Sequence, residues 1–173
     1  MITNESRDRV RGWFHGRLPV EWQAEAPEIT IDREEITVML TVPDVDLPGD
    51  VSEPEAAEAR AGRTKAFREE TREQRIEIAR EAEHRFDRKV SWGVTLGGRS
   101  ELFTHIAVPV MTRLRQPQRT VLDTLVDAGV ARSRSDALAW CVRLVGQHAD
   151  DWLGELREAM SHVAEVRKKG PAA

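Results

Sequence analysis

The first hundred residues alternate between patterns typical of strands and a pattern typical of a long helix. Ile29 and Ile31 alternate with polar residues, and the β-rich run 36–43 follows a short charged turn, so we expect a hairpin there. We expect a second hairpin from the runs 89–98 and 102–109, because two adjacent glycines end the first run. Between the hairpins, steps of three or four residues predict one long helix over 56–86. Its stripe is Phe67, Thr71, Gln74, Ile78, Ala82 and Phe86.

These elements predict the α+β class, with an N-terminal antiparallel sheet, the long helix and a short first helix over 6–14. Residues 44–58 interrupt the pattern, because they hold six acidic and no basic side chains together with Pro48, Gly49 and Pro54. Like charges without apolar periodicity are typical of a solvated segment. We therefore expect an α+β domain over 1–108 with a mobile acidic loop at 44–58.

From residue 109 onwards the pattern becomes mainly helical. The run Val110–Leu114 is typical of a short strand, and Pro117 suits the first turn of a helix. Gly129 suits the end of that helix, and Ser133 or Ser135 can cap a second one. With a third helix over about 150–169, these elements form an expected second domain at 109–173. The three apolar stripes are Val121, Leu122, Leu125 and Val126, then Leu138, Cys141, Val142 and Val145, and last Trp152, Leu156, Ala159, Val163 and Val166.

Charge distinguishes part of the C-terminal region from the rest. The whole chain has a net charge of -4, which argues against a protein that binds nucleic acid by overall charge alone. Residues 106–146 nevertheless hold six arginines and three aspartates, a local net charge of +3. The basic residues are mostly arginine, which is typical of a GC-rich bacterial genome. An acidic protein with one local basic surface fits this distribution.

An ordered set of features in this basic region resembles the ribbon-helix-helix family of DNA-binding proteins (MetJ- and Arc-like). The set is the strand VMTRL, a helix with Leu122 and Leu125, then Gly129 and the sequence RSRSDAL. The resemblance covers about residues 110–145, so only the C-terminal region is expected to be ribbon-helix-helix-like. It implies a homodimer whose strands pair into a two-stranded ribbon, which fits the major groove of DNA. The implied function is sequence-specific DNA binding by a transcriptional regulator.

The resemblance also assigns roles to individual residues. Alternation along the strand puts Met111, Arg113 and Arg115 on the outward side if Val110, Thr112 and Leu114 face the core. The family implies base contacts there, and arginine can bind guanine through two hydrogen bonds. It implies phosphate contacts near the start of the second helix, whose free N–H groups favour anions. The expected phosphate contacts are Arg119, Arg132, Ser133, Arg134 and Ser135.

No motif indicates catalysis, a metal or a cofactor. The five histidines are scattered and Cys141 is the one cysteine, so we expect no metal site. The glycine pair at 97–98 lacks the spacing of a phosphate-binding loop. No apolar run is long enough for a membrane span, and the N-terminus lacks a signal-peptide pattern. We therefore expect a cytoplasmic binding protein that is not an enzyme and needs no cofactor.

Two other functions fit the same residues. A non-enzymatic oligomerisation or interaction protein would use the same helices without binding DNA. An antitoxin would share the DNA-binding surface and neutralise a partner with residues 1–108. For that N-terminal domain itself, the sequence leaves open a small ligand, a protein partner or an extension of the dimer.

Overall fold

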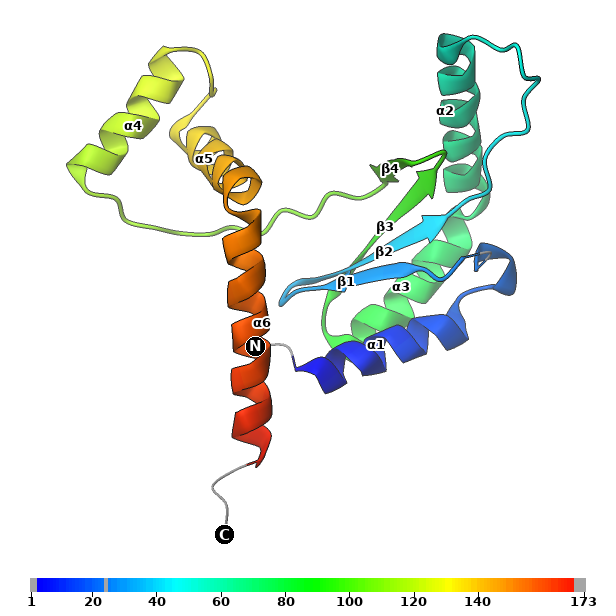
Figure 1. Ribbon diagram of the computed structural model, residues 1–173, viewed down its shortest axis with the longest axis horizontal. Coiled ribbons are helices and arrows are strands. Elements are labelled where there is room, and N and C mark those ends of the chain that lie inside the picture. Colours follow the sequence, from blue (N-terminus) through cyan, green and yellow to red (C-terminus); the bar gives the residue numbers. More distant parts are fainter. Residues whose placement is uncertain (1–2, 24, 170–173) are drawn as a thin grey trace. The chain divides into compact units, whose positions relative to one another are not determined.

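The computed structural model describes residues 3–23 and 25–169 and belongs to the α+β class (Figure 1). The chain divides into two compact units, residues 1–108 and residues 109–173. The described elements are α1 (Asn4–Arg17), the 3-10 turn η1 (Val20–Trp22), β1 (Glu28–Ile31), β2 (Glu35–Thr41), α2 (Glu53–Glu70), α3 (Arg72–Phe86), β3 (Lys89–Leu96), β4 (Arg99–Leu102), α4 (Gln116–Asp127), α5 (Arg134–His148) and α6 (Asp150–Lys169).

The sheet of the N-terminal unit has the order β1-β2-β3-β4. Its two outer pairs are antiparallel hairpins, and Gly97 and Gly98 form the second turn with positive φ. The strand expected at 102–109 was wrongly placed, because β4 starts directly after the two glycines and ends at Leu102. The central pair is parallel, with Ile36 opposite Val90 and Leu40 opposite Val94. The expectation of an antiparallel sheet was therefore wrong at this pair. The helical connection between β2 and β3 carries the chain back along the sheet, which makes the two strands parallel.

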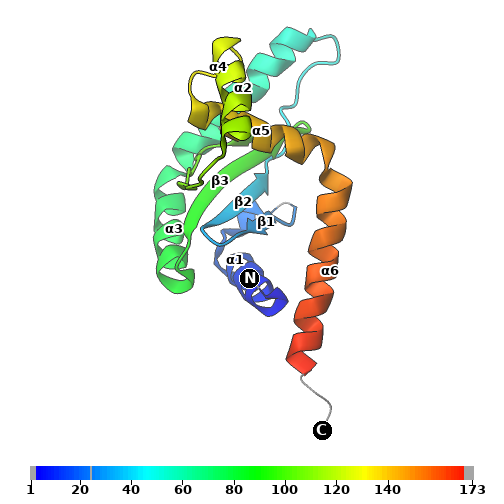
Figure 2. The ribbon, with the colours of Figure 1, turned by 90° about the vertical axis from the view of Figure 1, so that its left-hand side faces the viewer.

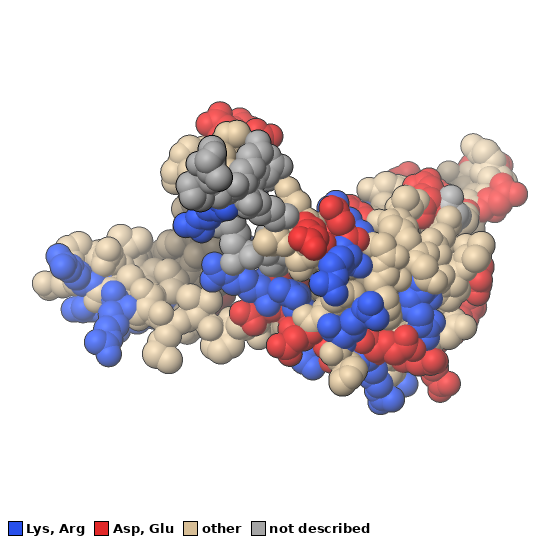
Figure 3. Space-filling model, turned by 90° about the horizontal axis from the view of Figure 1, so that it is seen from below, with Lys and Arg blue, Asp and Glu red and all other residues tan. Residues whose placement is uncertain are grey.

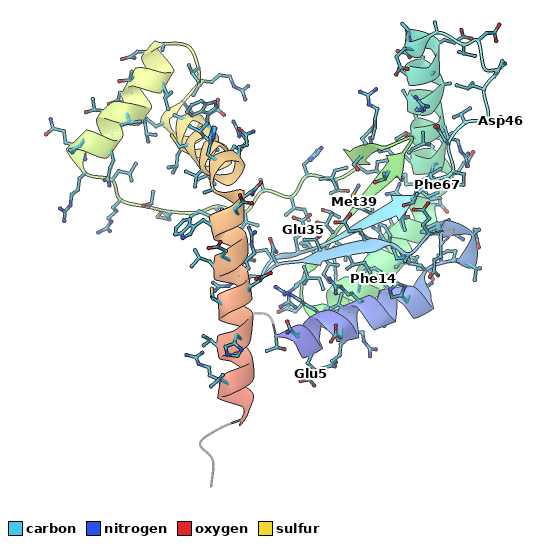
Figure 4. All side chains as sticks on the ribbon, viewed as in Figure 1. Glu5, Phe14, Glu35, Met39, Asp46 and Phe67 are labelled. Atoms are coloured by element: carbon cyan, nitrogen blue, oxygen red, sulfur yellow. The ribbon has the colours of Figure 1, made fainter. Side chains whose placement is uncertain are left out.

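The core of this unit lies between one face of the sheet and the three helices α1, α2 and α3 (Figure 2). Phe14 on α1 is completely buried, and Phe67 on α2 lies in the same core (Figure 4). Edge-to-face contacts join Phe14 to Trp92 at 6.2 Å and Trp92 to Trp22 at 6.3 Å between ring centroids. Such contacts add about 0.5–1.5 kcal/mol each to the gain from burial. These ring contacts connect α1 and η1 to β3, and a further contact joins Trp22 to Phe67 on α2.

The helix expected over 56–86 is longer at its start and is divided at Thr71 into α2 and α3. The Thr71 hydroxyl donates to the Phe67 carbonyl at 2.6 Å and accepts from the buried Arg75 guanidinium at 3.0 Å. Arg75 also donates to the Arg68 carbonyl at 2.6 Å and lies over the Phe103 ring. Burial, together with the charges of Arg68 and another arginine at position 72, lowers the pKa of Arg75 to about 10.

The loop expected at 44–58 ends earlier, because α2 begins at Glu53. The Ser52 hydroxyl accepts from the Glu55 N–H at 3.4 Å, and a proline lies in the first turn of the helix. Acidic side chains in a first turn are stabilised by the free N–H groups of the helix, so charge alone did not identify a loop. Further upstream, the Asp44 carboxylate accepts two hydrogen bonds from Arg60 at 2.9 Å, which connects the remaining loop to α2.

The C-terminal unit consists of α4, α5 and α6 in its described part. Leu122, Ala131 and Ala137 form its small buried core, and half-buried apolar side chains of α4 and α5 surround them. Among the described residues, α6 contributes none to this core. Packing against each other therefore stabilises α4 and α5, whereas α6 follows α5 along the chain and adds no described residue to their core.

Candidate nucleic-acid interface

The segment that leads into α4 carries the residues expected to contact bases. The Met111 side chain is 99% exposed, and Arg113 and Arg115 are also exposed. Leu114 instead packs against the buried core of α4 and α5. Neither Arg113 nor Arg115 forms an ion pair with another described residue. The contact of Leu114 thus orients this segment, and the two arginines beside Leu114 point to solvent without an ion-pair partner among the described residues.

The expected strand over 110–114 is absent from the single chain, because residues 104–115 have no regular secondary structure. A β-strand needs a neighbour for its backbone N–H and C=O groups, and no described strand pairs with this segment. Val110 is 86% exposed and Thr112 is also exposed, so of the three residues expected to face the core only Leu114 is covered.

The turn between α4 and α5 places the start of α5 against α4. Gly129 adopts φ +74°, which allows the chain to reverse after α4. The guanidinium of Arg134 donates to both carboxylate oxygens of Asp123, Nε to Oδ1 at 2.6 Å and Nη2 to Oδ2 at 2.8 Å. This pairing lowers the pKa of Asp123 and raises that of Arg134 through charge-assisted hydrogen bonds. Arg134, expected at a phosphate, is thus engaged with a carboxylate of its own chain.

Ser133 is the N-cap of α5, and its hydroxyl accepts from the Asp136 N–H at 3.2 Å. The Asp136 carboxylate in turn accepts from the Arg132 backbone N–H at 3.0 Å, which lowers the pKa of Asp136. The Arg132 guanidinium lies 3.7 Å from the same carboxylate and is almost fully exposed. Of the residues expected at phosphates here, Ser133 therefore has a structural role, and Ser135 is exposed.

Arg119 lies on the first turns of α4, where its guanidinium donates to the Leu114 carbonyl at 2.8 Å. This bond connects the helix to the segment that carries Arg113 and Arg115. Around it, a hollow of about 340 Å³ lies between the segment, α4 and α5. Its lining is mainly apolar at Val110, Met111, Leu122 and Leu138, with Arg119, Arg134 and Ser135 at its polar side.

Charge is distributed differently over the two units. On the face shown in Figure 3, the surface around the segment and α4 has basic and uncharged side chains, whereas the N-terminal unit has both signs intermixed. The aspartates that neutralise arginines of the C-terminal unit are Asp123 and Asp136. Sequence reasoning did not assign either of them a role. The spacing of Ser133 and Asp136 is that of a capping box and could have identified the second, whereas no local signal pairs Asp123 with Arg134.

A small hollow in the N-terminal unit is a place to consider for the ligand that the sequence left open for this unit. It has a volume of about 230 Å³ and lies between α2 and the β3–β4 hairpin. Ligand pockets typically measure about 300–1,000 Å³. Arg60, Thr64, Arg99 and Ser100 give it polar walls, and Arg60 is already paired with Asp44. The hollow is therefore a weak candidate for a small-molecule site.

In the described part of the chain, no helix has the length and apolar character of a membrane span.

Comparison with known proteins shows matches over both units. A family model described as the N-terminal domain of Rv1265-like proteins matches residues 8–102. A second model, described as the Mb1296 C-terminal domain, matches residues 115–167. Relatives include Mb1296 of Mycobacterium bovis and Rv1265 of Mycobacterium tuberculosis. Each is 59% identical over 159 residues, which cover 92% of this chain and 69% of the relative. No solved structure matches significantly.

Proposed function

This chain belongs to the Rv1265-like family, and we propose that it binds DNA sequence-specifically, as a dimeric transcriptional regulator of the ribbon-helix-helix type. The proposal is a binding function without catalysis or a cofactor. The observation that carries it is the segment before α4, where Met111, Arg113 and Arg115 are exposed while Leu114 packs inward. Val110 and Thr112 are also exposed in the single chain, and the proposed ribbon would turn them to the covered side with Leu114, which leaves the arginines outward as groove reading needs.

The missing strand partner supports a dimer. Two copies of the segment, paired antiparallel, would satisfy each other's backbone groups, and their outward arginines would lie on one face. The apolar side chains left open in the single chain also require a cover: Val110, Val121, Val142 and Val145 are each more than half exposed. A dimer would offer these exposed apolar side chains a cover.

The start of α5 is the proposed phosphate contact. Its first N–H groups, those of Arg134 and Ser135, have no described acceptor, and free N–H groups at a helix start favour anions. The Asp123–Arg134 pair holds this helix start against α4. In the proposal, Arg134 therefore positions the N–H groups, and Arg132 supplies mobile positive charge.

The test is retention of genomic DNA fragments across a salt series by the full chain and by Arg113→Ala. We expect wild type to select particular fragments, and Arg113→Ala to lose about 1–3 kcal/mol of discrimination between sites because a base contact is removed. Arg33→Ala is the matched control, since this exposed arginine lies in the β1–β2 turn of the other unit. It should leave the selection unchanged.

Two results would overturn the proposal. If wild type retains no fragment even at low salt, DNA is not the ligand. If Arg113→Ala and Arg33→Ala weaken binding equally for all fragments, the contact is a non-specific charge effect.

A function in assembly alone is the second candidate, because the same exposed apolar side chains would serve it without DNA. An antitoxin function would add binding of a protein partner by the N-terminal unit, detectable by co-expression with neighbouring gene products.

A further inference from the structure

The strand β1 is at one end of the sheet order, so only one of its edges is paired. In the turn of the first hairpin, the Asp32 N–H donates to the Glu35 carbonyl at 2.9 Å. Alternation from this bond directs the backbone groups of Thr30 toward β2 and those of Ile29 and Ile31 away from it. The N–H and C=O groups of these two isoleucines have no hydrogen-bond partner among the described residues. Such an edge can pair with another extended chain.

A hollow of about 150 Å³ lies at this edge, between β1 and α1. Its walls are Ile29, Thr30 and Ile31 on the strand and Arg7 and Arg11 on the helix. Figures 1 and 2 both show α1 beside β1. Ligand pockets typically measure about 300–1,000 Å³. The hollow therefore suits single side chains of a bound peptide better than a whole small molecule.

The two arginines give this hollow an unbalanced positive charge. Arg7 and Arg11 are exposed, and neither forms an ion pair with another described residue. The residues that line the hollow include no carboxylate within the described part of the chain. Like charges four residues apart on a helix repel each other. An anionic partner would therefore relieve this repulsion and form new contacts at the same time.

The spacing of the arginines matches that of an extended chain. Residues four positions apart on a helix lie about 6 Å apart along its axis. In a strand, side chains on one face are about 6.6 Å apart. Two alternate residues of an added strand can therefore meet one arginine each. Glu28 is exposed and lies on the opposite face of β1 from the buried Ile29, where it would repel a carboxylate. The intervening residues of the partner must therefore be uncharged.

We propose that the free edge of β1 binds an extended acidic peptide by strand addition, with carboxylates at alternate positions on Arg7 and Arg11. The peptide backbone pairs with the N–H and C=O groups of Ile29 and Ile31. Backbone pairing supplies the affinity, and the alternate side chains supply the selectivity. The site uses none of the residues proposed to contact DNA, so it stands or falls separately from that function.

Calorimetric titration of the full chain with a blocked heptapeptide of alternating threonine and glutamate tests the proposal. We expect saturable binding, and its absence at millimolar peptide would overturn the proposal. The Arg7→Gln/Arg11→Gln double variant should bind about tenfold more weakly, as expected for the loss of two exposed ion pairs. Arg9→Gln is the matched control and should keep the wild-type affinity, because Arg9 is exposed on the same helix and does not line the hollow.

Further peptides distinguish strand addition from attraction by charge alone. A peptide with lysine in place of glutamate should bind at least about tenfold more weakly. Two glutamate peptides, one N-methylated at its glutamates and one at its threonines, keep the charge and each lose half of their N–H donors. Only one set of N–H groups faces β1 in a paired strand, so one of the two should lose binding. Full affinity of both would overturn the proposal.

Amide hydrogen exchange then locates the contact. Exchange at Ile29 and Ile31 should slow when the peptide is added, whereas the amide of Thr30, which already faces β2, should not change. If saturating peptide slows neither isoleucine, the peptide binds elsewhere. If both are already slow in the free protein and speed up on dilution, a second copy covers the edge. Either result would overturn the proposal.

Discussion

Asp123 on α4 and Arg134 at the start of α5 form a bidentate ion pair, with donor–acceptor distances of 2.6 Å and 2.8 Å. The two residues are brought together by the turn at Gly129 rather than by neighbouring sequence positions. The pair fixes the direction in which α5 leaves the turn, and with it the helix start proposed to face phosphate.

The first prediction concerns this pair. Asp123→Ala and Arg134→Ala should each lower the melting temperature of the C-terminal unit, and the double variant should lower it by less than the two single effects combined, because both remove one interaction. Arg134→Lys should recover part of the loss, since lysine keeps the charge but cannot donate the parallel pair of hydrogen bonds. Full additivity in thermal unfolding would show that the pair does not couple.

The second prediction concerns acid. Hydrogen bonds to Arg134, to Arg60 and to the Arg132 N–H lower the folded-state pKa of Asp123, Asp44 and Asp136 respectively. A lowered folded pKa stabilises the fold above the unfolded pKa, about 3.9 for aspartate, and the stabilisation is lost as the pH falls through the folded value. The melting temperature should therefore change little between about pH 7 and 5 and fall below about pH 4.

Asp123→Asn is the control for the pH series. It removes one of the titrating groups, so its melting temperature should be lower at neutral pH and should fall less steeply in acid. A melting temperature that rises on acidification from pH 5 would contradict the assignment.

The third prediction concerns the aromatic core. Phe14 is completely buried against Trp92, so Phe14→Ala should lower the free energy of unfolding of the N-terminal unit by about 3–5 kcal/mol. Val20→Ala is the control, because Val20 is 84% exposed and its truncation should change stability by less than about 0.5 kcal/mol. Chemical denaturation followed by tryptophan fluorescence measures both, and an equal effect of the two would place Phe14 outside the core.

The fourth prediction compares two glycines of the C-terminal unit. Gly129→Ala forces a β-carbon into a positive-φ conformation and should destabilise by roughly 1–2 kcal/mol, although the space around it is open. Gly146→Ala lies inside α5, also with open space, and should stabilise by about 0.5–1 kcal/mol. The signs of the two changes in melting temperature are the measurement, and the same sign for both would contradict the backbone argument.

The hydrophobic pattern by itself determined most of the secondary structure. Steps of three and four residues identified the helices, alternation identified the first hairpin, and Gly129 marked a helix end, because each of these signals is local in the chain. The second hairpin was identified only up to its glycine turn, since β4 lies at Arg99–Leu102 and not at 102–109. The α+β class follows from the order of these elements.

Only the tertiary structure decided what depends on distant residues. The parallel pairing of β2 with β3 depends on where the helical connection returns the chain, and the acidic residues 53–58 became a helix because Ser52 caps it. The partnership of Arg134 with Asp123, and the contact of Leu114 that leaves Arg113 exposed, arise when α4 and α5 pack against each other. Periodicity determines which face of an element is apolar, whereas the residue that this face meets is set by the folded path of the whole chain.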